Sequence, residues 1–445
     1  MSTLSIQQKY GNRVPSFHHN QRQWPNVVLK KSPILFSTDL RDGNQALRNP
    51  MTFDQKLRLF QFLVSMGFKE IEVGHPSANQ GEFDFIRHLV DTPGLIPKDV
   101  LIQVIAPCRE EAVKRAVQSV QGAAQAIIFT YLPSSDNYRT TVLGISEEEW
   151  VDCAARVAKF AREITTATSS STTKWTWNFG FEDFANARLE AVVRCAEAVK
   201  ASWGPSVDAR MIFSLASSVE SSMPNVFADQ VERFCQSVSD RSCWRVSVHT
   251  HNDRGGAIST AELASLAGAD RVEGCLFGNG ERAGNMDLIT YALNRVSEGI
   301  DCGLDLSKLR DARQIYQDIV GIPIHPRTPY SGAYYLRAFS GGHQDAIVKG
   351  LERRALAEAD VTTQSSSTCW PQWSVPYLPI DPVDIGFGQE DIIEINSQSG
   401  KSGVKWVLQS RLGHEISRED AEETVRVVKM RSAGIDQATD ADELC

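Results

Sequence analysis

Two histidines that could bind a metal ion, His249 and His251, directly follow residues 244–248. In that run apolar and polar side chains alternate, which is typical of a β-strand. Because the histidines are two positions apart in extended chain, both imidazoles point to the same side and can share a divalent ion. A third ligand is expected in residues 37–45, Ser-Thr-Asp-Leu-Arg-Asp-Gly-Asn-Gln, which close another apolar run. One carboxylate and two imidazoles leave coordination positions open for a substrate.

Asp42 is the expected carboxylate ligand, with capping of a turn as the alternative role. Its neighbour Arg41 is the type of residue that holds a substrate carboxylate by a two-pronged contact. A Gly-rich loop at residues 278–285, Gly-Asn-Gly-Glu-Arg-Ala-Gly-Asn, places Asn285 where it could reach the metal directly or through water. Glu182 and Glu281 are candidates to orient donors or to take protons.

Elements that could position these side chains fill residues 33–305, where short apolar runs alternate with helical patterns. The expected strands are residues 34–38, 70–74, 101–106, 124–130, 174–180, 209–213, 245–249 and 272–275. Eight strand–helix units fit one α/β domain, a (β/α)8 TIM barrel. A doubly wound open sheet is the alternative, but it would need a Gly-rich phosphate turn after the first strand. In a barrel, chemistry gathers at the carboxyl ends of the strands, which is where most of the polar clusters fall.

The rest of the chain is expected to form an N-terminal arm at residues 1–32, a small mixed α/β accessory subdomain at 306–431 and a flexible tail at 432–445. Helices are expected over residues 306–320, 344–359 and 417–430. Residues 392–396 and 404–408 are expected as short strands or apolar packing segments, and the Ser/Thr-rich residues 362–368 as a flexible loop. His343 and the Pro-flanked Tyr377 lie in this part as candidate site residues, with a solvated histidine and a packing tyrosine as the alternatives.

Composition narrows the class of protein. The chain has 445 residues and a formal net charge of −9. It carries no basic face of the kind that binds nucleic acid, and no apolar run long enough to span a membrane. Nine cysteines are spread singly, which favours reduced thiols and a cytoplasmic location. The acid-poor, basic start leaves a mitochondrial location as the alternative.

Several motifs together resemble the alpha-isopropylmalate synthase family, among the aldolase-like barrels that begin with a DRE-type metal motif. The matching segments are residues 39–45, 70–74, 247–255, 273–282, 339–346, 375–382 and 396–401. The resemblance covers about residues 24 to 412. The last three segments are specific to the synthase branch rather than to barrels in general.

The resemblance implies a metal-dependent Claisen-type condensation of acetyl-CoA with a 2-oxo acid such as 3-methyl-2-oxobutanoate, giving a 2-alkylmalate and CoA, as in leucine biosynthesis. The metal ligands implied are Asp42, His249, His251 and Asn285, for Mg, Mn, Co or Zn. The catalytic residues implied are Arg41, Glu182, His343 and Tyr377. Substrate binding is expected at Arg41, Gln45, His75, Phe129 and Ser218, and acetyl-CoA at the loop of Gly278, Asn279, Gly280 and Glu281. The family also implies a homodimer, in which the accessory subdomain reaches the partner's active site.

Several positions depart from the family pattern. Residues 129–132 read Phe-Thr-Tyr-Leu where the family has His-x-Tyr-Asn, and residues 214–218 read Ser-Leu-Ala-Ser-Ser instead of Asn-Leu-Pro-x-Thr. His75 replaces an apolar residue, and Ala283 replaces a threonine. These changes predict either a bulkier or aromatic 2-oxo acid or drift within an ordinary isopropylmalate synthase.

Only about 33 residues follow Leu412, too few for the family's leucine-binding regulatory domain. We therefore expect that domain to be absent and the enzyme to be insensitive to leucine, as would suit a specialised biosynthetic pathway. Alternatives within the same chemistry are a homocitrate or citramalate synthase. A carbon–carbon lyase and a non-catalytic relative are further alternatives, but the accessory motifs and the intact metal ligands argue against them.

Overall fold

The computed structural model describes residues 19–167, 173–363 and 373–432. The chain divides into two compact units, residues 1–304 with 318–321 and residues 305–317 with 322–445. The first 18 residues of the expected arm, most of the expected loop at 362–368 and nearly all of the tail at 432–445 lie outside the described residues. In the described ranges, no helix is long and apolar enough to cross a membrane.

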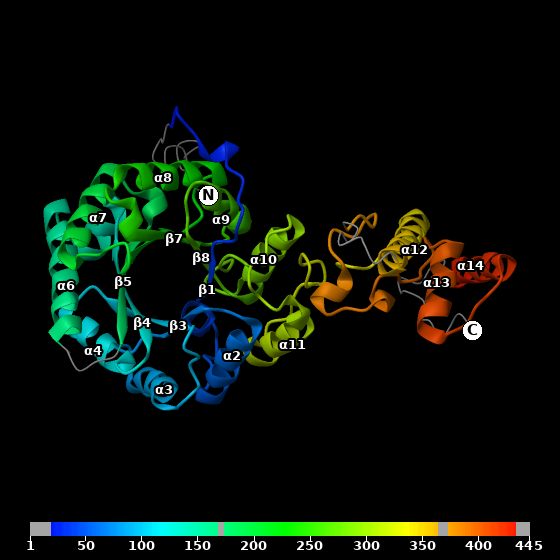
Figure 1. Cartoon of the computed structure of the whole chain (residues 1–445), viewed down its shortest axis with the longest axis horizontal. Helices are drawn as coiled ribbons and strands as arrows, with labels where there is room; N and C mark the ends of the chain where they lie inside the picture. Colours follow the sequence, from blue (N-terminus) through cyan, green and yellow to red (C-terminus); the bar gives the residue numbers. More distant parts are fainter. Residues whose placement is uncertain (1–18, 168–172, 364–372, 433–445) are drawn as a thin grey trace, which may run out of the picture. The chain divides into compact units, whose positions relative to one another are not determined.

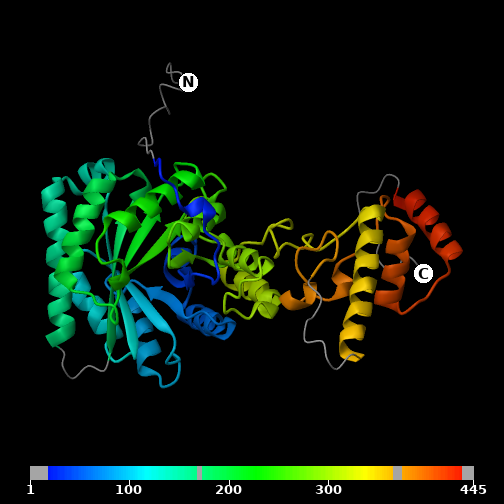
Figure 2. The ribbon, with the colours of Figure 1, turned by 45° about the horizontal axis from the view of Figure 1, so that its top comes forward.

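The first unit is a closed barrel of eight parallel strands in sequence order, which confirms the expected fold (Figures 1 and 2). The strands are β1 (Ile34–Ser37), β2 (Glu70–Gly74), β3 (Leu101–Pro107), β4 (Gln125–Pro133), β5 (Lys174–Glu182), β6 (Met211–Ser217), β7 (Trp244–Thr250) and β8 (Arg271–Gly274). β8 pairs with β1 in parallel register, Leu35 opposite Val272, and this pairing closes the barrel. The carboxyl ends of all eight strands therefore surround one mouth.

Helices surround the strands (Figure 1). They are α2 (Phe53–Met66), α3 (Gln80–Asp91), α4 (Glu110–Val120), α5 (Asp136–Tyr138), α6 (Glu147–Ala167), α7 (Leu189–Trp203), α8 (Pro224–Ser237), α9 (Ala257–Leu266) and α10 (Leu288–Ser297). Local signals fix their ends. In α2, for example, Thr52 and Gln55 form a capping box at the start, and Gly67 ends the helix in a left-handed conformation.

The inside of the barrel is polar near its centre, in contrast to the branched apolar layers that usually fill such barrels. Arg271 is fully buried and donates to Glu70 and Glu273 at 3.0 Å each. It also donates to the Ser247 hydroxyl at 2.7 Å, and its guanidinium lies 4.0 Å from the centre of the Phe36 ring. One buried cation thus holds two buried carboxylates in place below the mouth.

The second unit is helical over its described residues rather than mixed α/β. Its longer helices are α11 (Leu309–Val320), whose end belongs to the first unit, α12 (Gly341–Thr363), α13 (Lys401–Leu412) and α14 (Arg418–Ser432). Residues 404–408, expected as a strand or a packing segment, lie within α13 with Val404, Val407 and Leu408 buried. Residues 392–396 contribute an isolated bridge between Ile393 and Ala338. A short apolar run packs equally well as a helix face, so its composition alone could not decide the element.

Candidate active site

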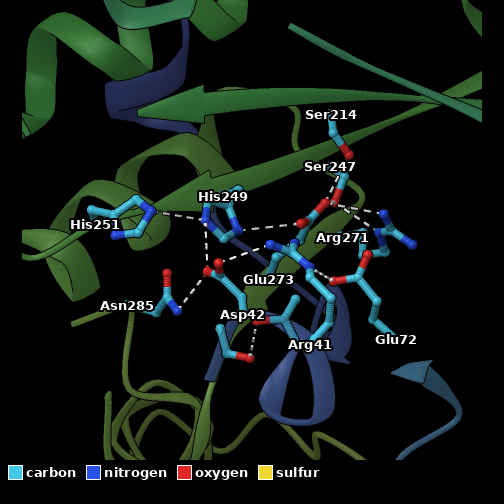
Figure 3. Close-up of polar contacts among 12 residues, drawn as sticks. Arg41, Asp42, Glu72, Ser214, Ser247, His249, His251, Arg271, Glu273 and Asn285 are labelled. Carbon is cyan, nitrogen blue, oxygen red and sulfur yellow. Dashed lines mark hydrogen bonds and ion pairs between the residues drawn. The ribbon is translucent and has the colours of Figure 1, made fainter. Parts of the chain in front are cut away.

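A cluster of metal-ligand side chains lies at the barrel mouth (Figure 3). Asp42 comes from a π-helical turn, Asp39–Gly43, that begins two residues after β1, and His249 and His251 come from the end of β7. One ligand atom from each of these three residues lies within 4.8 Å of the others. His249 Nε2 is 3.2 Å from His251 Nε2 and 3.5 Å from Asp42 Oδ2. The three side chains predicted from two separate motifs therefore lie close together.

Asn285 completes this cluster from the loop after β8. Its amide nitrogen donates to Asp42 Oδ2 at 2.8 Å. Its amide oxygen is buried and accepts no hydrogen bond from any described residue. A buried amide oxygen without a donor costs stability unless a cation or water satisfies it. The donor set of one carboxylate, two imidazoles and an amide oxygen fits a divalent ion.

The charge states of the cluster suit metal binding. Burial alone would raise the pKa of Asp42, but the charges of Arg41 and the two histidines hold it below its usual value. Asp42 is therefore ionised at neutral pH. Burial, with the nearby His249, lowers the pKa of His251 to about 3, so its imidazole is neutral. Neutral imidazole and ionised carboxylate are the ligating forms.

Two glutamates inside the barrel, Glu72 and Glu273, support this cluster, although no individual role was predicted for either of them. Glu273 Oε2 lies 3.4 Å from His249 Nδ1, on the ring edge opposite the cluster. Glu72 accepts from Arg41 Nε at 2.7 Å, while Arg41 Nη1 donates to Asp42 Oδ1 at 2.8 Å. A carboxylate behind a ligating histidine fixes the orientation of its ring. Both glutamates lie in motifs that resemble those of the family. Which side chains they face depends on the strand register, which places His249 directly opposite Glu273.

A cavity of about 310 Å³ opens beside the cluster. The sequence-predicted residues that line it are Arg41, Asp42, Gln45, His75, Phe129, Glu182, Ser218, His249, His251 and Glu281. Residues not selected from the sequence also line it, including Ile105, Tyr131, Tyr138, Gly180, Phe181 and Arg282. Apart from Asn285, which hydrogen-bonds to Asp42, the predicted catalytic, substrate and metal residues of the barrel therefore line one cavity.

One wall of the cavity is aromatic. A Cβ atom added to Gly180 would lie 2.5 Å from the Phe129 ring, so the ring occupies space that only a glycine leaves free. Phe129 and Tyr131 lie on the same strand with ring centres 6.1 Å apart. Two positions that are 51 residues apart in the chain therefore set the width of this wall together.

The Gly-rich loop after β8 folds tightly around Asn285. A Cβ atom on Gly280 would lie 2.3 Å from the Asn285 amide nitrogen, and one on Gly284 would lie 1.9 Å from a backbone oxygen. Asn279 donates to the Gly43 carbonyl at 2.9 Å and so braces the turn that carries Asp42. Gly278, Asn279 and Gly280 do not line the cavity, and their contact with acetyl-CoA stays a prediction.

His343 and Tyr377 both belong to the second unit, where the structure brings them together. Their rings stack with centres 4.0 Å apart and an interplanar angle of 27°. Tyr377 is 62% exposed and has a left-handed backbone, φ 62°. An exposed tyrosine in a strained conformation is not the packing residue that the alternative interpretation required. Their catalytic role stays a prediction.

Comparison with known proteins agrees with these features. The model of the HMGL-like family matches residues 32–315, and that of the alpha-isopropylmalate synthase, post-catalytic domain-like family matches residues 335–409. The fold is similar to that of hydroxymethylglutaryl-CoA lyase from Pseudomonas aeruginosa, with a TM-score of 0.53 at 18% identity over 66% of this chain and 95% of that one.

Curated relatives match nearly the whole chain. Isopropyl malate synthase AMT7 of Alternaria alternata is 62% identical, covering 98% of this chain and 75% of that protein. The 2-isopropylmalate synthase of Schizosaccharomyces pombe is 46% identical, covering 92% and 68%. The protein named 2-isopropylmalate synthase 2, mitochondrial, of Saccharomyces cerevisiae is 44% identical, covering 89% and 64%. These identities over most of the chain show that it belongs to the isopropylmalate synthase family.

Proposed function

We propose that this chain joins acetyl-CoA to a 2-oxo acid, with 3-methyl-2-oxobutanoate as the acid and 2-isopropylmalate and CoA as the products. The convergence of Asp42, His249 and His251 beside Arg41 in one cavity carries this proposal. The methyl carbon of acetyl-CoA loses a proton and forms a bond to the keto carbon. Water then cleaves the thioester and the CoA thiol leaves.

Asp42, His249, His251 and Asn285 would hold a divalent ion. When bound, that ion supplies positive charge that polarises the keto group and stabilises the negative charge developing on its oxygen. Mg, Mn, Co and Zn all accept this donor set, so the ligands do not select one metal.

The chain's own side chains would bind and orient the acid. Arg41 lines the cavity, and its hydrogen bonds to Asp42 and Glu72 fix its position there. The Ser218 hydroxyl accepts the backbone N–H of Asp183 at 2.8 Å, so its own proton is available for a substrate carboxylate. Such fixed donors act without reorganising during the reaction.

Glu182 is the proposed proton acceptor, and its pKa predicts the pH dependence. Burial, with the neighbouring Asp183, raises the pKa of Glu182 above its usual value. Because only the ionised form takes a proton, the rate should fall as the pH drops through this raised pKa, at a higher pH than for an exposed glutamate. We expect Glu182→Gln to lower kcat by about 10²- to 10⁴-fold and to remove this acid limb from the pH–rate profile. Glu281→Gln, a change at the same cavity, is the control, and its pH–rate profile should keep the acid limb. If the acid limb persists in Glu182→Gln, Glu182 is not the proton acceptor.

A bulkier or aromatic 2-oxo acid is the second candidate substrate, because Phe129 and Tyr131 form a wall of the cavity. Release of CoA, followed with a thiol reagent, should be compared for 3-methyl-2-oxobutanoate, pyruvate, 2-oxoglutarate, 4-methyl-2-oxopentanoate and phenylpyruvate. We expect 3-methyl-2-oxobutanoate to be preferred. Preference for phenylpyruvate would favour the second candidate, and no release with any acid would contradict the proposed function.

Phe129→Ala tests whether this wall selects the acid. Removing the ring enlarges the cavity, so kcat/KM for phenylpyruvate relative to 3-methyl-2-oxobutanoate should rise by about tenfold or more. Phe62→Ala, on α2, is the matched control and should leave the ratio unchanged. An unchanged ratio in Phe129→Ala would mean that the wall does not set specificity.

The homodimer, the roles of His343 and Tyr377 and the insensitivity to leucine stay predictions. Light scattering on the purified protein tests whether it forms a homodimer. Activity measured with and without excess leucine tests the insensitivity to leucine, and strong inhibition would contradict that prediction.

A further inference from the structure

A second cavity, of about 270 Å³, lies wholly within the second unit. Its walls come from one face of α11, from residues 332–337 and from residues 387–391. The α11 face consists of residues that lie on one side of the helix, Arg310, Arg313, Gln314 and Gln317. None of the residues assigned above to the condensation lines this cavity, so it is a separate site.

Two of the arginines at this cavity are already neutralised. Arg310 Nη2 donates to Asp391 Oδ2 at 2.8 Å, and Arg337 Nη1 donates to a carboxylate oxygen of Glu394. Asp391 is the one carboxylate among the described residues of the lining. Because it is paired with Arg310, its charge is compensated before any ligand binds.

Arg313 is the cation without a partner. Within the described ranges no carboxylate forms an ion pair with it, and its Nε is buried and donates no hydrogen bond. Its guanidinium lies 5.7 Å from the centre of the Phe387 ring, and that of Arg310 lies 5.0 Å from the same centre. Burial and the charge of Arg310 lower the pKa of Arg313, although Asp391 opposes this effect. A part-buried cation beside a second cation costs stability unless an anion compensates it.

The rest of the lining indicates which kind of anion would fit. Phe387, Ala333 and the buried Leu336 supply apolar walls next to Arg313. One uncompensated charge beside apolar side chains suits a ligand with a single negative charge and an apolar body. The planar fork of a guanidinium matches the two oxygens of a carboxylate. The volume limits the ligand to a small molecule.

We infer that this cavity binds a small monocarboxylate, with the carboxylate on Arg313 and the apolar body against Phe387 and Leu336. The inference goes beyond the proposed function, because it assigns a ligand to the second unit and not to the barrel. Phosphate also binds guanidinium groups, but its second negative charge would lack a partner here, since Arg310 and Arg337 are paired.

Fluorine NMR relaxation of 4-fluorobenzoate measures binding at this site in the full chain. The parent protein should carry Arg41→Gln, which removes the cation proposed for substrate carboxylates in the barrel. Adding Arg313→Gln should weaken binding of 4-fluorobenzoate by about 10- to 100-fold, because the charged hydrogen-bond donor is lost. Arg353→Gln is the matched control: Arg353 is an exposed arginine on α12 that does not line the cavity, so affinity should stay unchanged.

Competing compounds test the class of ligand. The neutral 4-fluorobenzamide should bind at least about tenfold more weakly than 4-fluorobenzoate, because it offers Arg313 no charge. Isobutyrate should displace the probe more strongly than inorganic phosphate does. If Arg313→Gln keeps the affinity of its parent, or if the amide binds equally well, the inference is overturned. Stronger displacement by phosphate would overturn the choice of a monocarboxylate.

Thermal unfolding gives a second measurement that does not depend on turnover. Arg313→Met keeps an unbranched apolar stem and removes the uncompensated charge, so without ligand its melting temperature should equal or exceed that of the wild type. Adding 4-fluorobenzoate should raise the melting temperature of the Arg41→Gln parent, but not that of the same parent carrying Arg313→Met. A lower melting temperature of ligand-free Arg313→Met would show that Arg313 supports the fold and would contradict a binding role. Because neither measurement uses the condensation, failure of the proposed function would leave both results readable.

Discussion

His249→Ala is expected to remove tight binding of a divalent ion and to lower kcat by at least about 1000-fold, since the ion's stabilisation of the developing charge supplies several kcal/mol. The substitution deletes one of the two imidazoles and leaves Asp42 and His251 facing a gap. It also leaves Glu273 without the ring that it orients at 3.4 Å. No neighbouring side chain of the cluster can replace the lost nitrogen, because the amide oxygen of Asn285 is a much weaker donor.

Metal content and catalysis should be measured together in this variant. Calorimetric titration of Mn²⁺ and CoA release at saturating substrates give the two values, and circular dichroism verifies the fold. His88→Ala is the matched control. His88 lies on α3, packs against Phe53 with ring centres 5.1 Å apart, and does not line the cavity. Full activity in His249→Ala would rule out the metal-dependent mechanism proposed above.

The pH dependence of metal binding has a predictable sign. Burial alone would lower the pKa of His249, but the hydrogen bond that its ring donates to Glu273 and the charge of Asp42 raise it above its usual value. Protons therefore compete with the ion at a higher pH than they would for an ordinary histidine. Affinity for Mn²⁺ should fall as the pH drops through this raised pKa.

Arg271→Leu is expected to destabilise the barrel by about 3–5 kcal/mol, which is the usual cost of removing one partner from a buried ion pair. The leucine would leave Glu70 and Glu273 inside the barrel without their shared cation. Ser247 would lose the donor that reaches its hydroxyl at 2.7 Å. Because Glu273 also orients His249, metal affinity should fall together with stability.

The guanidinium denaturation midpoint, followed by tryptophan fluorescence, measures this effect. Lys69→Ala breaks the exposed ion pair with Asp99 and should leave the midpoint nearly unchanged, since exposed pairs contribute little. Combining Arg271→Leu with Glu70→Gln should recover part of the loss, because one of the two carboxylates that lost Arg271 is then neutral. A single variant as stable as the wild type would show that Arg271 does not support the barrel.

The sequence by itself determined the order of the elements in the barrel and the three residues of the candidate metal cluster. Strand and helix periodicity is a local property, so eight strand–helix units could be recognised without knowing their contacts. The closed barrel then followed, and it brought the end of β1 and the end of β7 to the same mouth. Asp42, His249 and His251 meet there because Asp42 lies in the turn after β1, His249 lies near the end of β7 and His251 directly follows β7.

Only the tertiary structure decided which side chains touch across the barrel. The contact of Glu273 with His249 depends on the register of two neighbouring strands, which no local pattern encodes. The fit of the Phe129 ring over Gly180 likewise depends on two strands packing side by side. Residues 404–408 form a helix because their apolar face packs within the second unit, although the same composition suits a strand.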